Sequence, residues 1–435
     1  MSRIQAAALG AVVALLCSPG ADAAPPTGRA AAAQTAPVRI DRARIDKALA
    51  EMVASGRAAG VSALVWQDGA ERYFGTSGYA DREASRPMTR DTLVQVYSMT
   101  KPVTGVALMQ LWEKGRFGLD EPLARYLPEF ANMQVLDGKD ASGAPLYRPA
   151  KRPILIRDIL RHTAGFSYGF RETPADVAFR AADPLNLQND LTEMGHRMAR
   201  LPLMFDPGDQ WSYSAAVDVQ ALLVERLTGV PFETYVRTNI LDPLRMTQAG
   251  WTQPADRLGR FAATYVRAKG KLERQDDAKT RALNFAPRKL TMGGAGIAAP
   301  IDDYMRFARM LLNGGELDGA RILKPSTVRL MATDQLDPRM TERFFLPGKG
   351  SVGFGFDVAV RTARPKSAQE NRGAVGEFFW DGAATTLFWV DPANKLTAVF
   401  FVQTLPFDAT LHRDIRAAVY GPDYLGPAGD EAAGR

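Results

Sequence analysis

Short apolar runs bounded by turn residues occur near both ends of the chain. Residues 59–67 and 70–77 are β-prone, and the Asp68-Gly69 pair between them suits the positive φ of a two-residue hairpin turn. Four more β-prone runs lie late in the chain, at residues 352–361, 374–379, 385–390 and 396–403. Short turns join the last three runs, which predicts a meander. We therefore expect one antiparallel sheet that uses both ends of the chain.

The middle of the chain follows a helical period instead. Apolar side chains recur at three- and four-residue intervals over residues 101–114, 154–161, 217–227 and 301–313. Asp302 and Asp303 place carboxylates in the first turn of the last helix, and Gly314-Gly315 ends it. The pattern predicts an α/β fold of the α+β type, in which helices flank an antiparallel sheet that lies beside a mostly helical region.

The N-terminus is typical of a protein that is exported from the cell. Arg3 precedes an apolar stretch at residues 6–17, and the small-residue pattern Ala21-Asp22-Ala23 follows, which predicts a signal peptide over residues 1–23. We expect a secreted or periplasmic protein without stable membrane insertion, because this apolar stretch is too short to span a bilayer. A lipoprotein attached at Cys17 is the alternative, although Leu16 is bulky where such sites usually have a small residue.

Behind this leader the sequence predicts a single folded domain. A flexible Ala/Pro/Thr-rich segment is expected at residues 24–39, and a tail at residues 426–435. The domain between them would cover residues 40–425, with its sheet part at about 40–105 and 285–425 and its helical part at about 106–284. Proline and glycine stretches inside this range are interpreted as loops of the fold and not as linkers.

The composition excludes several chemistries. Cys17 is the only cysteine and would leave with the leader, so the mature chain has no thiol for a disulfide, a nucleophile or a metal site. The three histidines, His162, His196 and His412, form no pair with metal-binding spacing, and we expect no metal or other cofactor. The 54 basic and 48 acidic residues are interspersed, which argues against nucleic acid as a partner.

One segment has the residues of an activated nucleophile. The chain has no Gly-x-Ser-x-Gly elbow, and Ser98 is the only serine followed by a lysine, Lys101, three residues later. Residues three apart share one face of a helix, so the hydroxyl and the amine can come within hydrogen-bond reach. A lysine in a dry pocket loses its proton more easily, and its neutral amine can then accept the serine proton. The N–H groups at the helix N-terminus would stabilise an oxyanion.

Two further segments are candidates for the same site. Tyr213 follows a Pro-Gly loop and precedes a helix, and we expect a nearby lysine to lower the pKa of its phenol so that it shares a proton with serine. The alternative for this residue is a buried tyrosine with a satisfied hydroxyl. The other segment is Trp380-Asp381-Gly382-Ala383 on the late meander, where Gly382 would let the backbone approach a ligand. An ordinary Asp-Gly hairpin turn is the alternative there.

Several motifs occur together in one order and resemble the serial signatures of the serine β-lactamase-like superfamily. They span about residues 40 to 420 and are Ser98-Met99-Thr100-Lys101-Pro102, Leu160-Arg161-His162-Thr163-Ala164-Gly165-Phe166, Pro207-Gly208 with Trp211-Ser212-Tyr213-Ser214, Gly293-Gly294-Ala295-Gly296-Ile297 and Asn313-Gly314-Gly315. The chain is similar to the class C branch and to the family VIII carboxylesterases, which implies a β-lactamase/transpeptidase-like fold.

The resemblance also implies roles for individual residues. Ser98 is expected to be the nucleophile, Lys101 its general-base partner and Tyr213 the second residue that moves protons. The backbone N–H groups of Ser98 and Ala383 are expected to form the oxyanion hole. His162 belongs to a His-Thr-x-Gly segment that is structural in the family.

Two departures separate the chain from true class C β-lactamases. Those enzymes carry Tyr-x-Asn and Lys-Thr-Gly, whereas this chain has Ala215 in place of the asparagine and Trp380 in place of the lysine. Asp381 adds a negative charge, so a substrate carboxylate would find no cationic partner. The esterase branch has similar patterns, and we assign substrate binding to the residues Ala215, Trp380, Asp381 and Gly382.

These residues predict a carboxylesterase that cleaves small short-chain acyl esters through an acyl-enzyme on Ser98. The esterase branch includes members with weak cephalosporin hydrolysis, so the prediction allows a weak β-lactamase activity. Three alternatives stay open: a β-lactamase or D-alanyl-D-alanine peptidase, an amidase for nylon-type oligomers, and a non-catalytic sensor related to penicillin-binding proteins.

Overall fold

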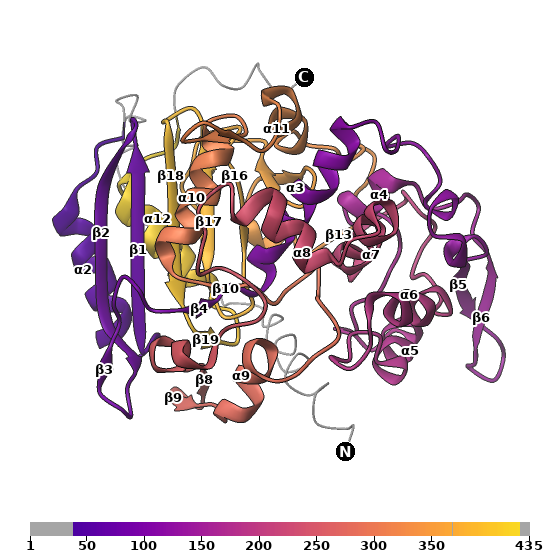
Figure 1. Cartoon of the computed structure of the whole chain (residues 1–435), viewed down its shortest axis with the longest axis horizontal. Coiled ribbons are helices and arrows are strands. Elements are labelled where there is room, and N and C mark those ends of the chain that lie inside the picture. Colours follow the sequence, from indigo (N-terminus) through magenta and orange to yellow (C-terminus); the bar gives the residue numbers. More distant parts are fainter. Residues whose placement is uncertain (1–37, 368, 427–435) are drawn as a thin grey trace, which may run out of the picture.

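An eight-stranded antiparallel sheet is the largest element of the computed structural model, which describes residues 38–367 and 369–426 (Figure 1). In spatial order its strands are β14 (Val352–Phe354), β15 (Ala359–Arg361), β16 (Phe378–Asp381), β17 (Leu387–Asp391), β18 (Leu396–Val402), β1 (Gly60–Gln67), β2 (Ala70–Asp81) and β3 (Arg86–Pro87). The two ends of the chain meet where β1 pairs with β18, with Val61 opposite Val402. The prediction of one sheet from both ends is therefore confirmed.

The turns of this sheet follow the sequence pattern with one exception. Asp68 and Gly69 form the β1–β2 turn with φ values of 52° and 76°. The run at residues 352–361, which the pattern predicts as one strand, is instead a hairpin of β14 and β15. A Cβ at Gly355 would lie 1.9 Å from the carbonyl oxygen of Met331, so the chain bends where only glycine fits.

Helices cover both faces of the sheet. On one face Tyr304 of α10 (Ile301–Leu312) contacts Phe388 of β17, with ring centroids 5.2 Å apart. On the other face Arg416 of α12 (Ala409–Tyr420) lies over the ring of Trp389, the next residue of the same strand. Successive side chains of a strand point to opposite faces, so α10 and α12 lie on opposite sides of the sheet (Figure 1). α2 (Arg42–Ala54) packs beside α12.

The helical region adjoins the α10 face. α3 (Thr100–Glu113) contacts α7 (Ala216–Thr228) and α8 (Phe232–Val236). The remaining helices are α4 (Ile156–Leu160), α5 (Pro174–Ala182), α6 (Leu191–Ala199), α9 (Asp277–Phe285) and α11 (Pro325–Met331). Short helical turns lie at η1 (Tyr97–Met99), η2 (Leu123–Arg125), η3 (Pro128–Phe130), η4 (Arg237–Leu241), η5 (Ala255–Arg260) and η6 (Pro347–Lys349).

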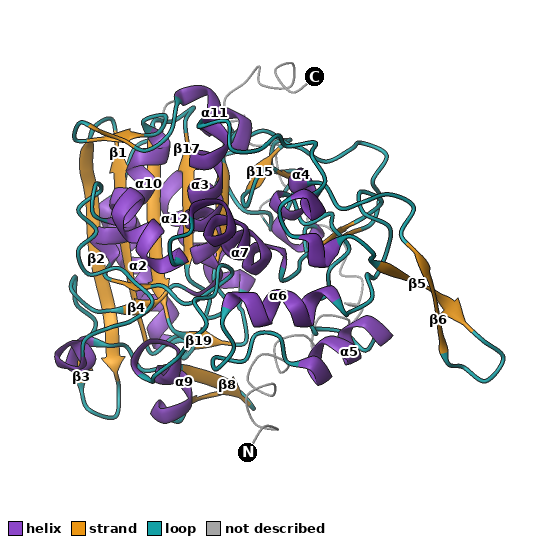
Figure 2. Ribbon diagram, turned by 45° about the vertical axis from the view of Figure 1, so that its right-hand side comes forward, coloured by secondary structure: helices purple, strands orange, loops and turns teal. Residues whose placement is uncertain are grey.

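Small sheets lie outside the main sheet, and some of them interrupt the region that the pattern predicts as mostly helical. β5 (Gln134–Lys139) and β6 (Pro145–Pro149) form a hairpin that projects from the rest of the molecule (Figure 2). A three-stranded sheet joins β19 (Thr404–Leu405), β8 (Tyr265–Ala268) and β9 (Lys271–Arg274). The two-stranded pairs are β4 (Val94–Gln95) with β10 (Ala298–Ala299), β7 (Trp211–Ser212) with β13 (Arg343–Phe344), and β11 (Glu316–Leu317) with β12 (Ala320–Arg321).

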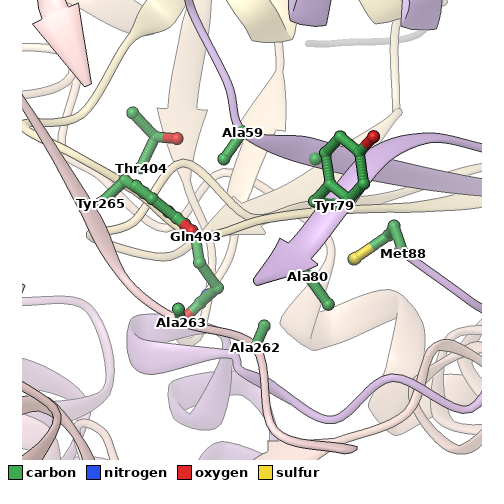
Figure 3. A pocket seen from close by; sticks show the side chains of 10 residues that line it. Ala59, Tyr79, Ala80, Met88, Ala262, Ala263, Tyr265, Gln403 and Thr404 are labelled. Atoms are coloured by element: carbon green, nitrogen blue, oxygen red, sulfur yellow. The ribbon is translucent and has the colours of Figure 1, made fainter. Parts of the chain in front are cut away.

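Two cavities lie away from Ser98. Figure 3 shows a cavity of about 10 Å³ between Gly60, Tyr79, Ala263 and Tyr265, where the three-stranded sheet meets β1 and β2. Its volume suits about one water molecule and no substrate. A groove of about 510 Å³ lies beside the β5–β6 hairpin, and its lining includes Phe130, Met133 and Ala150. Neither lining includes a residue of the predicted site.

Some expectations concern residues outside the described part of the chain. These are the signal peptide at residues 1–23, residues 24–37 of the flexible segment, and residues 427–435 of the tail. Within the described residues, no helix combines the length and hydrophobicity that crossing a bilayer requires.

Candidate active site

Ser98 lies at the entrance to α3. β4 pairs with β10, Tyr97 then adopts a left-handed φ of 46°, and the 3₁₀ turn η1 carries Ser98 to the first residue of the helix. The helix begins at Thr100, one residue before the predicted start at residue 101. Ser98 is partly exposed, whereas Lys101 in the first turn of α3 is 0% exposed. The turn nevertheless keeps both side chains on one face, because Lys101 Nζ lies 3.2 Å from Ser98 Oγ.

The Lys101 amine has three oxygen partners. Nζ donates to Ser98 Oγ at 3.2 Å, to the Tyr168 hydroxyl oxygen at 3.2 Å and to the Gly294 carbonyl oxygen at 2.7 Å. Burial lowers the pKa of Lys101 to about 8, and the negative charges of nearby aspartates oppose this effect. A neutral amine would keep two N–H groups on Gly294 and Tyr168, so its lone pair would be directed at Ser98. This arrangement suits a base that takes the serine proton.

Tyr213 closes the other side of Ser98. It lies between β7 and α7, at the predicted junction of loop and helix. Its ring centroid is 4.7 Å from Lys101 Nζ, and its hydroxyl accepts a hydrogen bond from Trp380 Nε1 at 3.3 Å. Burial raises the pKa of Tyr213, and hydrogen bonds with Ser98 and Trp380 counteract this only in part. The expectation of a lowered pKa is therefore wrong, and the phenol keeps its proton.

Tyr168 is a member of the cluster that the sequence reasoning missed. Its hydroxyl contacts Lys101 Nζ, and burial raises its pKa well above the usual value. Asp176 fixes the loop around it, because one carboxylate oxygen accepts hydrogen bonds from Ser167 Oγ at 2.6 Å and from the Gly169 N–H at 3.0 Å. The available signal was its position, two residues after the motif that ends at Phe166.

The turn after β16 lies against the segment that leads into η1. A Cβ on Gly382 would lie 2.5 Å from the Val96 carbonyl oxygen, so glycine allows this turn to touch the segment that leads into η1. Thr386 Oγ1 donates to the same Val96 oxygen at 3.3 Å. The next residue, Ala383, is partly exposed. The close approach at Gly382 is therefore to the protein's own backbone, whereas the sequence led us to expect an approach to a ligand.

The charge of Asp381 is compensated, which corrects the expectation from sequence. Its carboxylate forms an ion pair with Lys349, and both side chains are 11% exposed. Lys349 Nζ also lies 4.8 Å from the centroid of the Trp380 ring. Lys349 precedes Asp381 by 32 residues and belongs to no motif, so the sequence carried no signal for this pair. The charge of Asp381 is therefore paired with a cation, although its carboxylate still acts on the pKa of Lys101.

The remaining predicted residues lie around this cluster at different depths. Trp380 is 2% exposed and reaches Tyr213 through its indole N–H. Ala215 is 0% exposed at the N-cap of α7, so it lies below the surface that Ser98 and Tyr213 share. His162 is 1% exposed, its Nδ1 is 3.2 Å from Ser214 Oγ, and burial holds its pKa well below the usual value. A neutral, buried imidazole is consistent with a structural role.

Aromatic rings line the site. Ring centroids between 4.9 and 6.4 Å from that of Tyr213 belong to His162, Tyr168, Phe170, Trp211, Phe345 and Trp380. Phe170 and Phe345 are partly exposed, like Ser98. The accessible wall beside the hydroxyl is therefore apolar and suits an uncharged substrate. In the described part of the chain, no cluster of three or more histidine, cysteine, aspartate or glutamate side chains has a geometry that would hold a metal ion.

Comparison with known proteins decides the family. The sequence model of the Beta-lactamase family matches residues 45–420. The chain belongs to the Beta-lactamase family. Esterase EstB of Burkholderia gladioli is 34% identical over 83% of this chain and 90% of that protein. Monacolin J acid methylbutanoyltransferase of Aspergillus terreus is 30% identical over 76% of this chain and 81% of that protein.

A solved structure confirms the expected fold. EstCE1, described as a hydrolase with promiscuous acyltransferase activity, superposes with a TM-score of 0.71 at 25% identity, over 87% of this chain and 98% of that chain. This chain thus has the β-lactamase-like fold of a serine hydrolase. Its relatives include both esterases and acyltransferases.

Proposed function

We propose that this protein is a carboxylesterase that cleaves small short-chain acyl esters through an acyl-enzyme on Ser98. One observation carries the proposal: Lys101 Nζ lies 3.2 Å from Ser98 Oγ while Gly294 and Tyr168 occupy its other two N–H groups. A serine held this way beside a lysine of lowered pKa is an activated nucleophile. The esterase relative supports the same class of substrate.

The proposed reaction uses these groups one after another. Ser98 Oγ attacks the ester carbonyl carbon while its proton passes to the neutral amine of Lys101. The backbone N–H groups of Ser98 and Ala383 stabilise the resulting oxyanion. Tyr213 donates its proton to the leaving alcohol, and the proton on Lys101 restores that of the phenol. Water then attacks the acyl-enzyme with the same groups in reverse order, releasing the carboxylic acid and free Ser98.

An ester is preferred to a β-lactam because of what surrounds the hydroxyl. Position 215 is an alanine and position 380 a tryptophan, so neither supplies an amide or a cation to a lactam. Lys349 lies beside Trp380, and its ion pair with Asp381 leaves no net charge there for a substrate carboxylate. The partly exposed rings of Phe170 and Phe345 favour an uncharged acyl or alcohol group.

A stopped-flow burst with a chromogenic acetate or butyrate ester tests the proposal. We expect one equivalent of alcohol in the burst, and a loss of turnover of about 10³-fold or more in Ser98→Ala. Ser142→Ala is the matched control, because Ser142 is exposed in a turn of the β5–β6 hairpin. Wild-type turnover in Ser98→Ala, or a much higher kcat/KM for a cephalosporin or a D-Ala-D-Ala peptide than for the ester, would reject the carboxylesterase.

Acyl transfer to an alcohol is the second candidate activity. The apolar ring lining favours an organic acceptor over water, and the relatives include an acyltransferase and a hydrolase with promiscuous acyltransferase activity. Adding a primary alcohol to the ester assay separates the two outcomes. A transferase gives a new ester at the expense of free acid, whereas a strict hydrolase gives free acid at every alcohol concentration.

We also propose that the protein is exported from the cytoplasm, because residues 1–23 have the pattern of a cleavable signal peptide. Expression of the full chain in a bacterial host followed by intact mass measurement tests it. The expected product is a periplasmic or secreted protein that begins at Ala24. A product that keeps Met1 and stays in the cytoplasm would contradict export, and a product with a lipid on Cys17 would replace cleavage after Ala23 by lipoprotein processing.

A further inference from the structure

A buried carboxylate lies behind the loop that contacts Lys101. Asp218 is in the first turn of α7 and is 0% exposed. Its Oδ1 accepts a hydrogen bond from the Gly294 N–H at 3.0 Å, and its Oδ2 has no hydrogen-bond partner among the residues that the structure describes. A buried carboxylate with so few partners is costly, so its position needs a physical reason.

Gly294 connects this carboxylate to the amine. Its N–H donates to Asp218, and its carbonyl oxygen accepts from Lys101 Nζ at 2.7 Å. A Cβ on Gly294 would lie 2.8 Å from Asp218 Oδ2, 2.9 Å from the Tyr168 hydroxyl oxygen and 3.1 Å from Lys101 Nζ. Asp218, Tyr168 and Lys101 thus converge on the space that a side chain at Gly294 would fill.

The residues on either side of Gly294, Gly293 and Ala295, are held by other side chains. Thr104 Oγ1 donates to the Gly293 carbonyl oxygen at 2.7 Å, and Trp251 Nε1 lies 3.0 Å from the Ala295 carbonyl oxygen. These contacts fix both sides of Gly294 through carbonyl groups. The Gly294 N–H belongs to the same peptide group as the Gly293 carbonyl, so Asp218 and Thr104 together hold the peptide group that precedes the Gly294 carbonyl.

We propose that Asp218 is a positioning residue for the Lys101 amine. Its carboxylate, together with Thr104, holds the peptide group in front of Gly294, which keeps Gly294 in the position where its carbonyl oxygen meets Lys101 and the amine is aimed at Ser98. Its described hydrogen bond reaches Gly294 and not Ser98, so Asp218 acts through that glycine and through its charge. The inference rests on the proposed function, in which Lys101 is the base.

The charge of Asp218 gives this role a measurable signature. The carboxylates of Asp218, Asp357 and Asp381, in that order, raise the pKa of Lys101 against the larger effect of burial. They come from α7, from the β14–β15 turn and from β16. The other titratable side chains that face the amine are Tyr168, Tyr213 and His162. Removing the charge of Asp218 therefore makes Lys101 easier to deprotonate.

Two substitutions separate the hydrogen bond from the charge. Asp218→Asn keeps an oxygen acceptor for the Gly294 N–H and removes the charge, so the rise of kcat/KM with pH moves to lower pH while the plateau is kept. Asp218→Ala removes both, so the plateau kcat falls by about 10- to 100-fold, the cost of a reacting group misplaced by about 1 Å. KM for the ester stays unchanged, because Asp218 does not touch the substrate.

Asp303 supplies a matched control for stability. It is also a buried aspartate in the first turn of a helix, α10, and it accepts the N–H groups of Gln248 and Ala249 at 2.7 and 2.8 Å. It is not among the charges that act on Lys101. Asp303→Asn and Asp303→Ala therefore lower the melting temperature without changing the pH profile, which is the behaviour of a purely structural aspartate.

The outcomes distinguish this inference from the proposed function. If Asp218→Asn has the wild-type pH profile, or if folded Asp218→Ala has the wild-type plateau kcat, the positioning role is rejected. If Asp218→Ala does not fold, the profile of Asp218→Asn decides alone. If Lys101→Ala keeps wild-type turnover, the proposed function itself fails. If Lys101→Ala is inactive while both Asp218 variants keep the wild-type pH profile and plateau kcat, only the role of Asp218 is rejected.

Discussion

At the scale of single residues, the protonation state of Lys101 governs the reactivity of Ser98. All three donors of the ammonium have oxygen partners, so the charged form is well satisfied and cannot accept a proton. Burial lowers the pKa of Lys101 to about 8, which leaves a useful fraction of neutral amine near neutral pH.

The first prediction follows from this pKa. Because only the neutral amine can act as the base, kcat/KM for a short ester rises with pH and levels off above about pH 8. Initial rates from about pH 6 to about pH 10 with a chromogenic ester measure it. A profile that is flat over this range, or that falls where Lys101 loses its proton, would contradict the assignment of the base.

The second prediction concerns the Tyr168 hydroxyl. Tyr168→Phe keeps the ring but removes an oxygen that holds one N–H of Lys101, so the amine is aimed less well at Ser98. A hydrogen bond to a charged group contributes about 1.5–3 kcal/mol, so kcat is expected to fall by about tenfold or more. Tyr79→Phe is the control, because Tyr79 is 43% exposed. Equal turnover numbers in both variants would remove Tyr168 from the mechanism.

Some residues of the candidate site could be predicted from the sequence and others could not. Ser98 and Lys101 were predictable because three residues of helix bring them together whatever surrounds them. Tyr168 and Lys349 were not, because their contacts with Lys101 and Asp381 join segments 67 and 32 residues apart. The pKa of Tyr213 was predicted in the wrong direction, since burial depends on neighbours from many elements and outweighs one nearby cation.

At the scale of elements, the β16–β17 turn connects the sheet to the nucleophile. Gly382 touches the Val96 backbone, and the Thr385 carbonyl oxygen lies 2.9 Å from His412 Nε2 of α12. The turn is therefore held from both sides, as the oxyanion hole proposed at Ser98 and Ala383 requires. The strands of the meander were predictable from their pattern, but this attachment was not, because it joins three separate segments.

The third prediction tests this turn. Gly382→Ala forces a Cβ to within 2.5 Å of the Val96 carbonyl oxygen, so the turn shifts away from Ser98. Overpacking of this kind lowers the free energy of unfolding by about 1–3 kcal/mol and displaces the Ala383 N–H, which lowers kcat. Gly259→Ala is the control, because a Cβ there meets nothing within 4 Å. Urea unfolding and ester turnover measure both effects, and an unchanged kcat in Gly382→Ala would separate the turn from the oxyanion.

At the scale of the whole molecule, two buried histidines make stability depend on pH. Burial lowers the pKa of His412 to about 4 and that of His162 well below the usual 6.5. Between those values and 6.5 the unfolded chain binds protons that the folded chain does not. The free energy of unfolding therefore falls as the pH falls from about 6.5 to about 4.

The fourth prediction measures this loss. For His412 the shift corresponds to about 3 kcal/mol over that range. His412→Asn is expected to flatten the pH dependence of the free energy of unfolding, measured by urea titration at a series of pH values. His196→Asn is the control, because His196 is exposed on α6. A slope that His412→Asn leaves unchanged would show that other groups cause the acid sensitivity.

By itself, the sequence determined the features that depend on neighbours along the chain: the hairpin at Asp68-Gly69, the late meander, the helix that ends at Gly314, and the pairing of Ser98 with Lys101. Only the tertiary structure decided how Lys101 loses its charge, which groups hold its amine, and that Lys349 neutralises Asp381. The physical reason is that local geometry follows from nearby residues, whereas burial and electrostatic interactions depend on segments that folding brings together.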